Sequence, residues 1–81
     1  MPTRRVDHLA EEPLWQQLYE ILRDQIVSGA IPVGTILNER PISLEHGVAR
    51  ETVRRALQAL DRDGLCRALR SRGWGVLGPP P

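Results

Sequence analysis

Polar and charged side chains fall on one side of a helix predicted over residues 50–63. They belong to Arg50, Glu51, Arg54, Arg55 and Gln58. An arginine guanidinium can donate two hydrogen bonds to one guanine, and a glutamate can accept one from the amino group of cytosine. The chemistry favoured by these residue types is therefore the reading of base edges in duplex DNA.

The other side of the same segment is apolar. Val53, Ala56, Leu57 and Leu60 are spaced i, i+3, i+4 and i+7, which predicts a helix packed on a core. A turn at Gly47 precedes this helix, and another segment with apolar residues precedes the turn. This order predicts a helix-turn-helix whose second helix exposes its polar face.

Charge is distributed unevenly along the chain, although the formal net charge is only +1. Residues 1–49 hold four Arg and seven acidic residues, a balance of −3, whereas residues 50–81 hold seven Arg and three acidic residues, a balance of +4. All eleven basic residues are Arg, the side chain best suited to planar, bidentate contacts. The positive charge collects on the predicted recognition helix and the segment after it, as expected for phosphate binding.

Length and composition restrict the other possibilities. The 81 residues suffice for one small domain. The sequence has no apolar run near the roughly 20 residues of a membrane span and no apolar signal-peptide region at its start. The single cysteine, Cys66, cannot form an internal disulfide and is predicted to be a buried strand residue. The expected compartment is the cytoplasm.

The sequence contains no recognisable pattern of catalytic residues. It has no Ser/His/Asp or Cys/His set, no paired metal-ligand spacing and no glycine loop for phosphate. The segment 43–46 has residue types that can move protons, but it falls on a short predicted helix. We therefore expect neither an enzyme nor a bound cofactor or metal.

The elements before the recognition helix can be placed from turn and capping signals. Residues 1–12 are predicted to form a loosely ordered N-terminal arm, and Pro13 to open a helix that ends at Ser28–Gly29. Residues 35–37 are predicted to be extended. Asn38 is a candidate cap for a short second helix that ends at Gly47.

The segment after the recognition helix predicts a hairpin. Gly64 should end the helix, and residues 65–69 and 74–77 read as two strands joined by a turn at residues 70–73. A hairpin in this position is a wing. The predicted fold is thus mainly α with a small β-hairpin wing: a winged helix-turn-helix over residues 13–77, with three helices, a short strand and a two-stranded wing. Residues 78–81 form a Pro-rich tail.

The motifs resemble a known family. They are Pro-Leu-Trp-Gln-Gln-Leu from Pro13, Gly-Val-Ala-Arg-Glu-Thr-Val-Arg-Arg-Ala-Leu from Gly47, and Asp-Gly-Leu from Asp63. Over about residues 13–77 the chain resembles the N-terminal winged-helix domain of the GntR family of bacterial transcription regulators. The resemblance implies a sequence-specific, duplex-DNA-binding regulator, such as a repressor.

The resemblance also implies roles for residues of the helix-turn-helix. Arg50 corresponds to an arginine that reads guanine in the major groove. Thr52 and Arg54 match phosphate-holding positions, and Glu51 lies where the family varies and is expected to set operator preference. Arg40 resembles a second family arginine that reads a base or holds a phosphate. The segment between Gly34 and Gly47 is one residue shorter than the family pattern, so this equivalence depends on where the missing residue falls.

The same resemblance implies a role for the wing and predicts the binding partners of the chain. The wing tip, Arg70, Ser71, Arg72 and Gly73, corresponds to the part that enters the minor groove. Two chains are expected to pair on a near-palindromic operator. A small-molecule effector is expected only if a further C-terminal domain exists, so the chain is either a fragment or a stand-alone regulator. The alternative function is a winged-helix module for protein contacts without DNA binding.

Three residues depart from the family pattern. Ala49 stands where Ser or Thr usually caps the recognition helix, and alanine cannot provide that hydrogen bond. His46 stands where a large apolar residue is usual, and is expected to be a partly buried structural histidine. Ser71 replaces the first of two wing glycines.

Overall fold

Three helices and three short strands make up the computed structural model, which describes residues 4–79. The helices are α1 (Leu14–Val27), α2 (Glu39–His46) and α3 (Arg50–Arg62). The strands are β1 (Ile36–Leu37), β2 (Cys66–Leu69) and β3 (Gly73–Val76). The chain order is α1, β1, α2, α3, β2, β3, which confirms the predicted winged helix-turn-helix.

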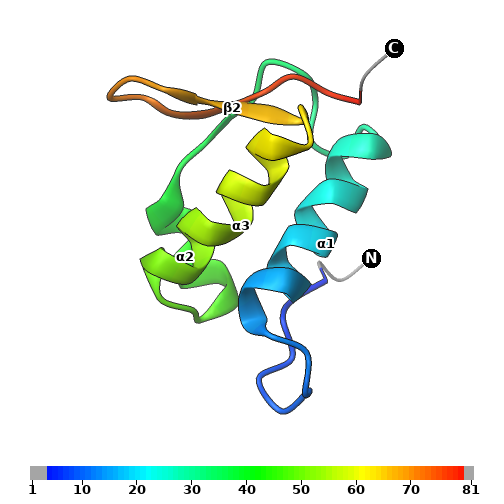
Figure 1. The fold of residues 1–81 in the computed structure, drawn as a ribbon, viewed down its shortest axis with the longest axis vertical. Coiled ribbons are helices and arrows are strands. Elements are labelled where there is room, and N and C mark those ends of the chain that lie inside the picture. Colours follow the sequence, from blue (N-terminus) through cyan, green and yellow to red (C-terminus); the bar gives the residue numbers. More distant parts are fainter. Residues whose placement is uncertain (1–3, 80–81) are drawn as a thin grey trace.

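The strands form one antiparallel sheet in the order β1-β3-β2. In β3, Trp74 lies opposite Leu37 of β1 and Ala68 of β2. The short extended segment before α2 is therefore the third strand of the wing sheet. Figure 1 shows the sheet lying across one end of α1 and α3, with the β2–β3 turn projecting beyond the helices.

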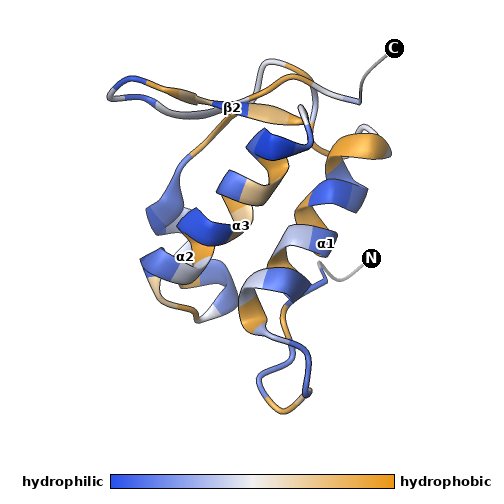
Figure 2. Cartoon of the chain, in the orientation of Figure 1, coloured by the Kyte–Doolittle hydropathy of each residue, from blue (hydrophilic) through white to orange (hydrophobic). Residues whose placement is uncertain are grey.

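The core lies between the helices and the inner face of the sheet. Its largest fully buried side chains are Leu18, Ile21, Val53, Leu57, Leu60 and Cys66. In Figure 2, hydrophobic and hydrophilic residues alternate along α1 and α3, as expected for helices with one buried face. The burial of Cys66 agrees with the prediction for this residue and raises the pKa of its thiol to about 11.

Helix ends follow the predicted signals in most places. Gly47 adopts a left-handed conformation with φ 65° directly after α2, which lets the chain turn sharply into α3. Asn38 precedes α2, but the prediction of a side-chain cap is wrong. The structure gives the reason, because the Asn38 Oδ1 atom lies against the start of β3, within 2.8 Å of where a Cβ on Gly73 would stand.

The predicted loose arm is attached to the helices at Val6 and Asp7, although most of residues 4–12 are exposed. Val6 is buried at 8% exposure and belongs to the core. The backbone N–H of Asp7 donates to Gln17 Oε1 over 2.8 Å, and Gln17 Nε2 donates to the Asp7 carbonyl over 3.1 Å. These residues are held because the Val6 side chain packs in the core, and because backbone groups of Val6 and Asp7 form hydrogen bonds with His46 of α2 and Gln17 of α1.

The predicted Pro-rich tail is described only up to Pro79, so its last two residues, like residues 1–3 of the arm, lie outside the described residues. Among residues 4–79, none of the helices is long and apolar enough to cross a membrane.

Candidate nucleic-acid interface

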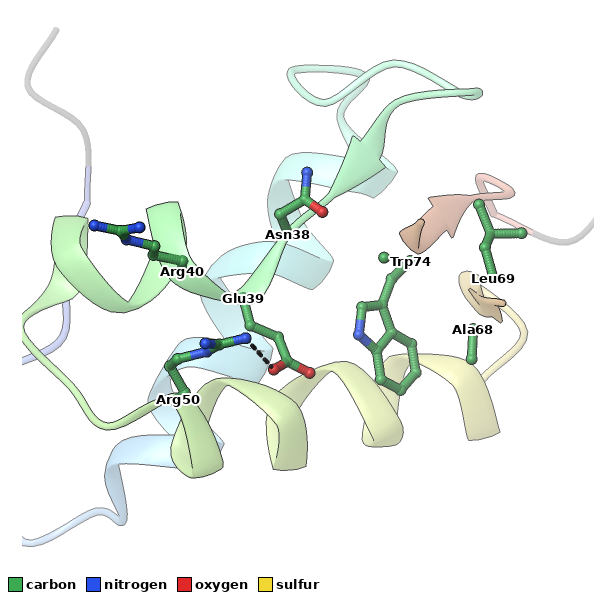
Figure 3. Close-up of a pocket in the computed structure, with 8 residues that line it drawn as sticks. Asn38, Glu39, Arg40, Arg50, Ala68, Leu69 and Trp74 are labelled. Atoms are coloured by element: carbon green, nitrogen blue, oxygen red, sulfur yellow. Dashed lines mark hydrogen bonds and ion pairs between the residues drawn. The ribbon is translucent and has the colours of Figure 1, made fainter. Parts of the chain in front are cut away.

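A groove of about 450 Å³ opens where the starts of α2 and α3 meet the wing. Residues that line it include Glu39, Arg40, Arg50, Leu69, Gly73 and Trp74. Figure 3 shows Arg40 and Arg50 near one end of the groove and Trp74 near the other, with Glu39 between them. The fold thus brings together side chains from a helix start, the recognition helix and a wing strand.

Arg50 is the first residue of α3 and extends from the surface, with 61% of its side chain exposed. Its Nη2 atom lies 3.5 Å from Glu39 Oε1, at the limit of a hydrogen bond. The other guanidinium N–H groups remain available to a ligand, since arginine carries five donors. The structure therefore leaves the predicted guanine-reading residue accessible.

Arg54 lies one turn further along α3 and is held by two carboxylates. Its Nε and Nη2 atoms donate to Glu39 Oε2 and Oε1 over 3.1 and 3.0 Å. Its Nη1 atom donates to Glu51 Oε2 over 3.0 Å. Glu51 is 82% exposed, so this last ion pair is well solvated and weak. A phosphate approaching Arg54 can displace Glu51 more readily than Glu39.

Glu39, which has no role predicted from the sequence, lies between the two arginines of α3 and the wing. Only 14% of its side chain is exposed. The hydrogen bonds from Arg54 hold the pKa of the Glu39 carboxyl below its usual value, with smaller contributions from the Trp74 side chain and the charge of Arg50, against the effect of burial. One signal could have identified Glu39: it is an acidic residue at the start of a helix that packs against an arginine-rich helix.

Arg40 and Thr52 lie in the first turns of α2 and α3. Arg40 is exposed on the first turn of α2 and borders the groove with Arg50. Thr52 is half-buried in the first turn of α3. Both residues lie near helix N-termini, where backbone N–H groups favour anions.

The wing tip divides into an exposed turn and a tightly packed glycine. Arg70, Ser71 and Arg72 are exposed between β2 and β3. Gly73 instead lies in the groove with φ 97°, and a Cβ there would stand 2.5 Å from the carbonyl oxygen of Leu37. Of the four predicted wing residues, three are accessible to a ligand, and Gly73 allows the backbones of β3 and β1 to approach.

Arg55 faces away from the groove, toward α1. Its guanidinium lies 4.7 Å from the centre of the Trp15 ring, a cation–π contact. Trp15 is half-buried. Both residues therefore belong to the packing between α1 and α3.

Comparisons with known proteins identify relatives of the chain. The model of the gntR family of bacterial regulatory proteins matches residues 14–76. The HTH-type transcriptional regulator GgaR of Escherichia coli K12 is 42% identical over 65 residues, which cover 79% of this chain and 25% of GgaR. The chain thus spans about a quarter of the length of this curated relative.

Solved structures give the same result. A putative GntR regulator from Rhodococcus sp. RHA1 is 36% identical with a TM-score of 0.76, covering 82% of this chain and 32% of that one. The DBD of AraR, solved in complex with operator ORX1, is 26% identical with a TM-score of 0.78, covering 90% of this chain and 94% of that one.

Proposed function

The chain belongs to the GntR family of bacterial regulatory proteins, and from this premise we propose that it binds duplex DNA sequence-specifically and regulates transcription. The family and the named relatives are regulators, which confirms the expectation that the chain is not an enzyme. The observation that carries the proposal is the exposed Arg50 at the start of α3, beside a groove that ends at an arginine-bearing wing.

In the proposed complex, α3 enters the major groove with its N-terminal end foremost. Arg50 bonds guanine, and Glu51 accepts from cytosine once it leaves Arg54. Thr52 and Arg54 hold phosphates, and these contacts fix the register of α3 on the duplex. Arg40 supplies a second contact at the edge of the groove, to a base or a phosphate.

The wing completes the complex on the adjacent minor groove. Arg70, Ser71 and Arg72 form its exposed tip, and Gly73 sets the backbone at its root. Arginine is favoured in a narrow minor groove because of the negative potential there. The wing therefore adds affinity and only coarse sequence preference.

Two chains acting on a near-palindromic operator are part of the proposal. A pair of recognition helices reads half-sites one helical turn apart or a multiple of it, and the operator mirrors the symmetry of the pair. A small-molecule effector would require a further domain, and the relative GgaR is about four times as long as the matched segment. A regulator of bacterial genes would act in the cytoplasm.

The alternative is a winged-helix module that binds a protein instead of DNA. An exposed apolar patch on α3 would favour this function. The exposed residues of α3 are instead charged or polar, among them Arg50, Glu51 and Gln58. This composition supports DNA as the partner.

Selection of bound duplexes from a random pool tests the proposal. A DNA-binding regulator should enrich one motif with two half-sites at a fixed spacing, and the motif defines the operator used in the experiments below. Binding should also weaken with salt, with a slope of about −0.9 in log K against log salt for each neutralised phosphate. No enrichment and a flat salt response would favour the protein-interaction alternative.

A further inference from the structure

Three elements of the interface meet at one carboxylate. Glu39 is the first residue of α2, and its two oxygens accept from Nε and Nη2 of Arg54 over 3.1 and 3.0 Å. Glu39 Oε1 also lies 3.5 Å from Nη2 of Arg50. From β3, the indole ring of Trp74 lines the same groove and lies beside Glu39 in Figure 3, and the Trp74 side chain contributes to the lowered pKa of the Glu39 carboxyl.

The root of the wing is fixed against the residues just before Glu39. In the sheet, Leu37 pairs with Trp74. A Cβ on Gly73 would stand 2.5 Å from the Leu37 carbonyl oxygen and 2.8 Å from Asn38 Oδ1. This close approach means that the wing strand cannot shift relative to the start of α2 without breaking contacts of Leu37 or Asn38.

A carboxylate at this place opposes the binding of phosphates. Its negative charge neutralises part of the positive charge of Arg50 and Arg54, and so lowers affinity for any duplex. A bidentate carboxylate–guanidinium pair, however, fixes the plane of the guanidinium as well as its position. The contribution of Glu39 to binding is therefore geometric, and geometry matters most for base contacts.

We propose that Glu39 is a positioning residue for DNA recognition, which orients Arg50 and Arg54 and joins them to the wing through Trp74. The inference rests on the proposed function and goes beyond it by naming a residue that makes the major-groove and wing contacts form together. It explains why an acidic side chain, largely buried, lies in the middle of an arginine-rich face.

The first test compares Glu39→Gln with the unmodified protein on two duplexes of equal length, the selected operator and an unrelated sequence. Glutamine keeps the size of the side chain and removes its charge. Affinity for the unrelated duplex should stay the same or rise, while the ratio of operator to unrelated affinity should fall about tenfold, the loss expected for one good base contact. A purely structural role would lower both affinities together.

Glu45→Gln is the matched control. Glu45 lies on the same helix as Glu39 and is exposed. Its change to glutamine removes one negative charge, as Glu39→Gln does. Glu45 lines a different hollow, beside His46 and Ile42. The affinity ratio of this variant should equal that of the unmodified protein.

Trp74→Phe is a second variant, useful if Glu39→Gln does not fold. Phenylalanine keeps an aromatic ring against the core but removes the indole N–H together with the rest of the five-membered ring. The affinity ratio should fall in the same direction, by a smaller factor. Thermal unfolding of each variant, followed by circular dichroism, establishes which variants are folded at the temperature of the binding assay.

The inference is overturned if folded Glu39→Gln keeps the affinity ratio, or if it loses operator and unrelated affinity in parallel. It is also overturned if Trp74→Phe leaves the ratio unchanged when Glu39→Gln cannot be folded. An unmodified protein without any operator preference would instead contradict the proposed function, so the two failures can be told apart.

Discussion

The imidazole of His46 accepts a hydrogen bond from the backbone N–H of Val6, with 3.3 Å between Nδ1 and the nitrogen. The His46 carbonyl oxygen, in turn, lies 3.2 Å from Nε2 of His8. His46 is buried, and burial lowers the pKa of its imidazole. Among the neighbouring charges, Glu45 acts to raise this pKa and Arg5 to lower it further. The predicted structural histidine thus attaches the N-terminal arm together with Gln17.

This relationship predicts a stability that falls with decreasing pH. Because the pKa of His46 in the folded state is lower than the 6.5 of an unperturbed histidine, the unfolded chain binds the proton first. The contribution is fully present above about pH 6.5 and is lost as the pH falls from there toward the folded-state pKa. Protonated Nδ1 also cannot accept from Val6. Urea unfolding between pH 7.5 and 5.5 should show this loss.

His46→Leu provides the comparison for the pH experiment. Leucine restores the apolar type usual in the family and cannot titrate. The free energy of unfolding of this variant should change much less over the same pH range. An equal pH dependence in His46→Leu would assign the effect to another group.

The start of α3 lacks a side-chain cap, as the sequence predicts. Ala49 occupies the N-cap position with extended backbone angles and makes no side-chain hydrogen bond. Ala49→Ser should increase the free energy of unfolding by about 1 kcal/mol, because the hydroxyl can accept from a free backbone N–H in the first turn. Ala49→Val, which cannot accept a hydrogen bond, is the control. Denaturant unfolding of both variants measures the difference.

Ser71 is the only non-glycine residue with a positive φ among residues 4–79, at φ 61°. A side chain in this left-handed region costs roughly 1–2 kcal/mol, which glycine avoids. Part of that gain is offset because glycine loses more backbone entropy on folding. Ser71→Gly should therefore be more stable than Ser71→Ala, by about 1 kcal/mol in chemical unfolding. Equal stability of the two variants would show that the turn relaxes without strain.

Arg50 and Arg72 should differ in what they contribute to DNA binding. Arg50→Ala should cost about 1–3 kcal/mol on the operator and remove the preference for one base pair in each half-site. Arg72→Ala should weaken binding to all sequences by a similar factor and lessen the salt slope by about one unit if it contacts a phosphate. Titrations with the operator and its single-base variants distinguish these effects. Uniform weakening by Arg50→Ala would exclude base reading by this residue.

The elements of the fold could be predicted because their signals are local. The apolar spacing of Val53, Ala56, Leu57 and Leu60 defines the buried face of α3, and all four are buried. Gly47 and Gly64 take positive φ values directly after α2 and at the end of α3. Such signals depend on residues within a few positions of one another, so they can be read without knowing how the elements pack.

The sequence by itself determined the winged helix-turn-helix, its arginine-rich helix and the exposure of Arg50. Tertiary structure alone decided that Arg54 is held by Glu39, 15 residues away, and that Val6 bonds to His46, 40 residues away. These partners depend on how α2, α3 and the arm dock, which is governed by side-chain packing across the core. Residue types and local spacing do not encode which of several carboxylates will meet a given guanidinium, because docking brings together residues that are distant in the chain.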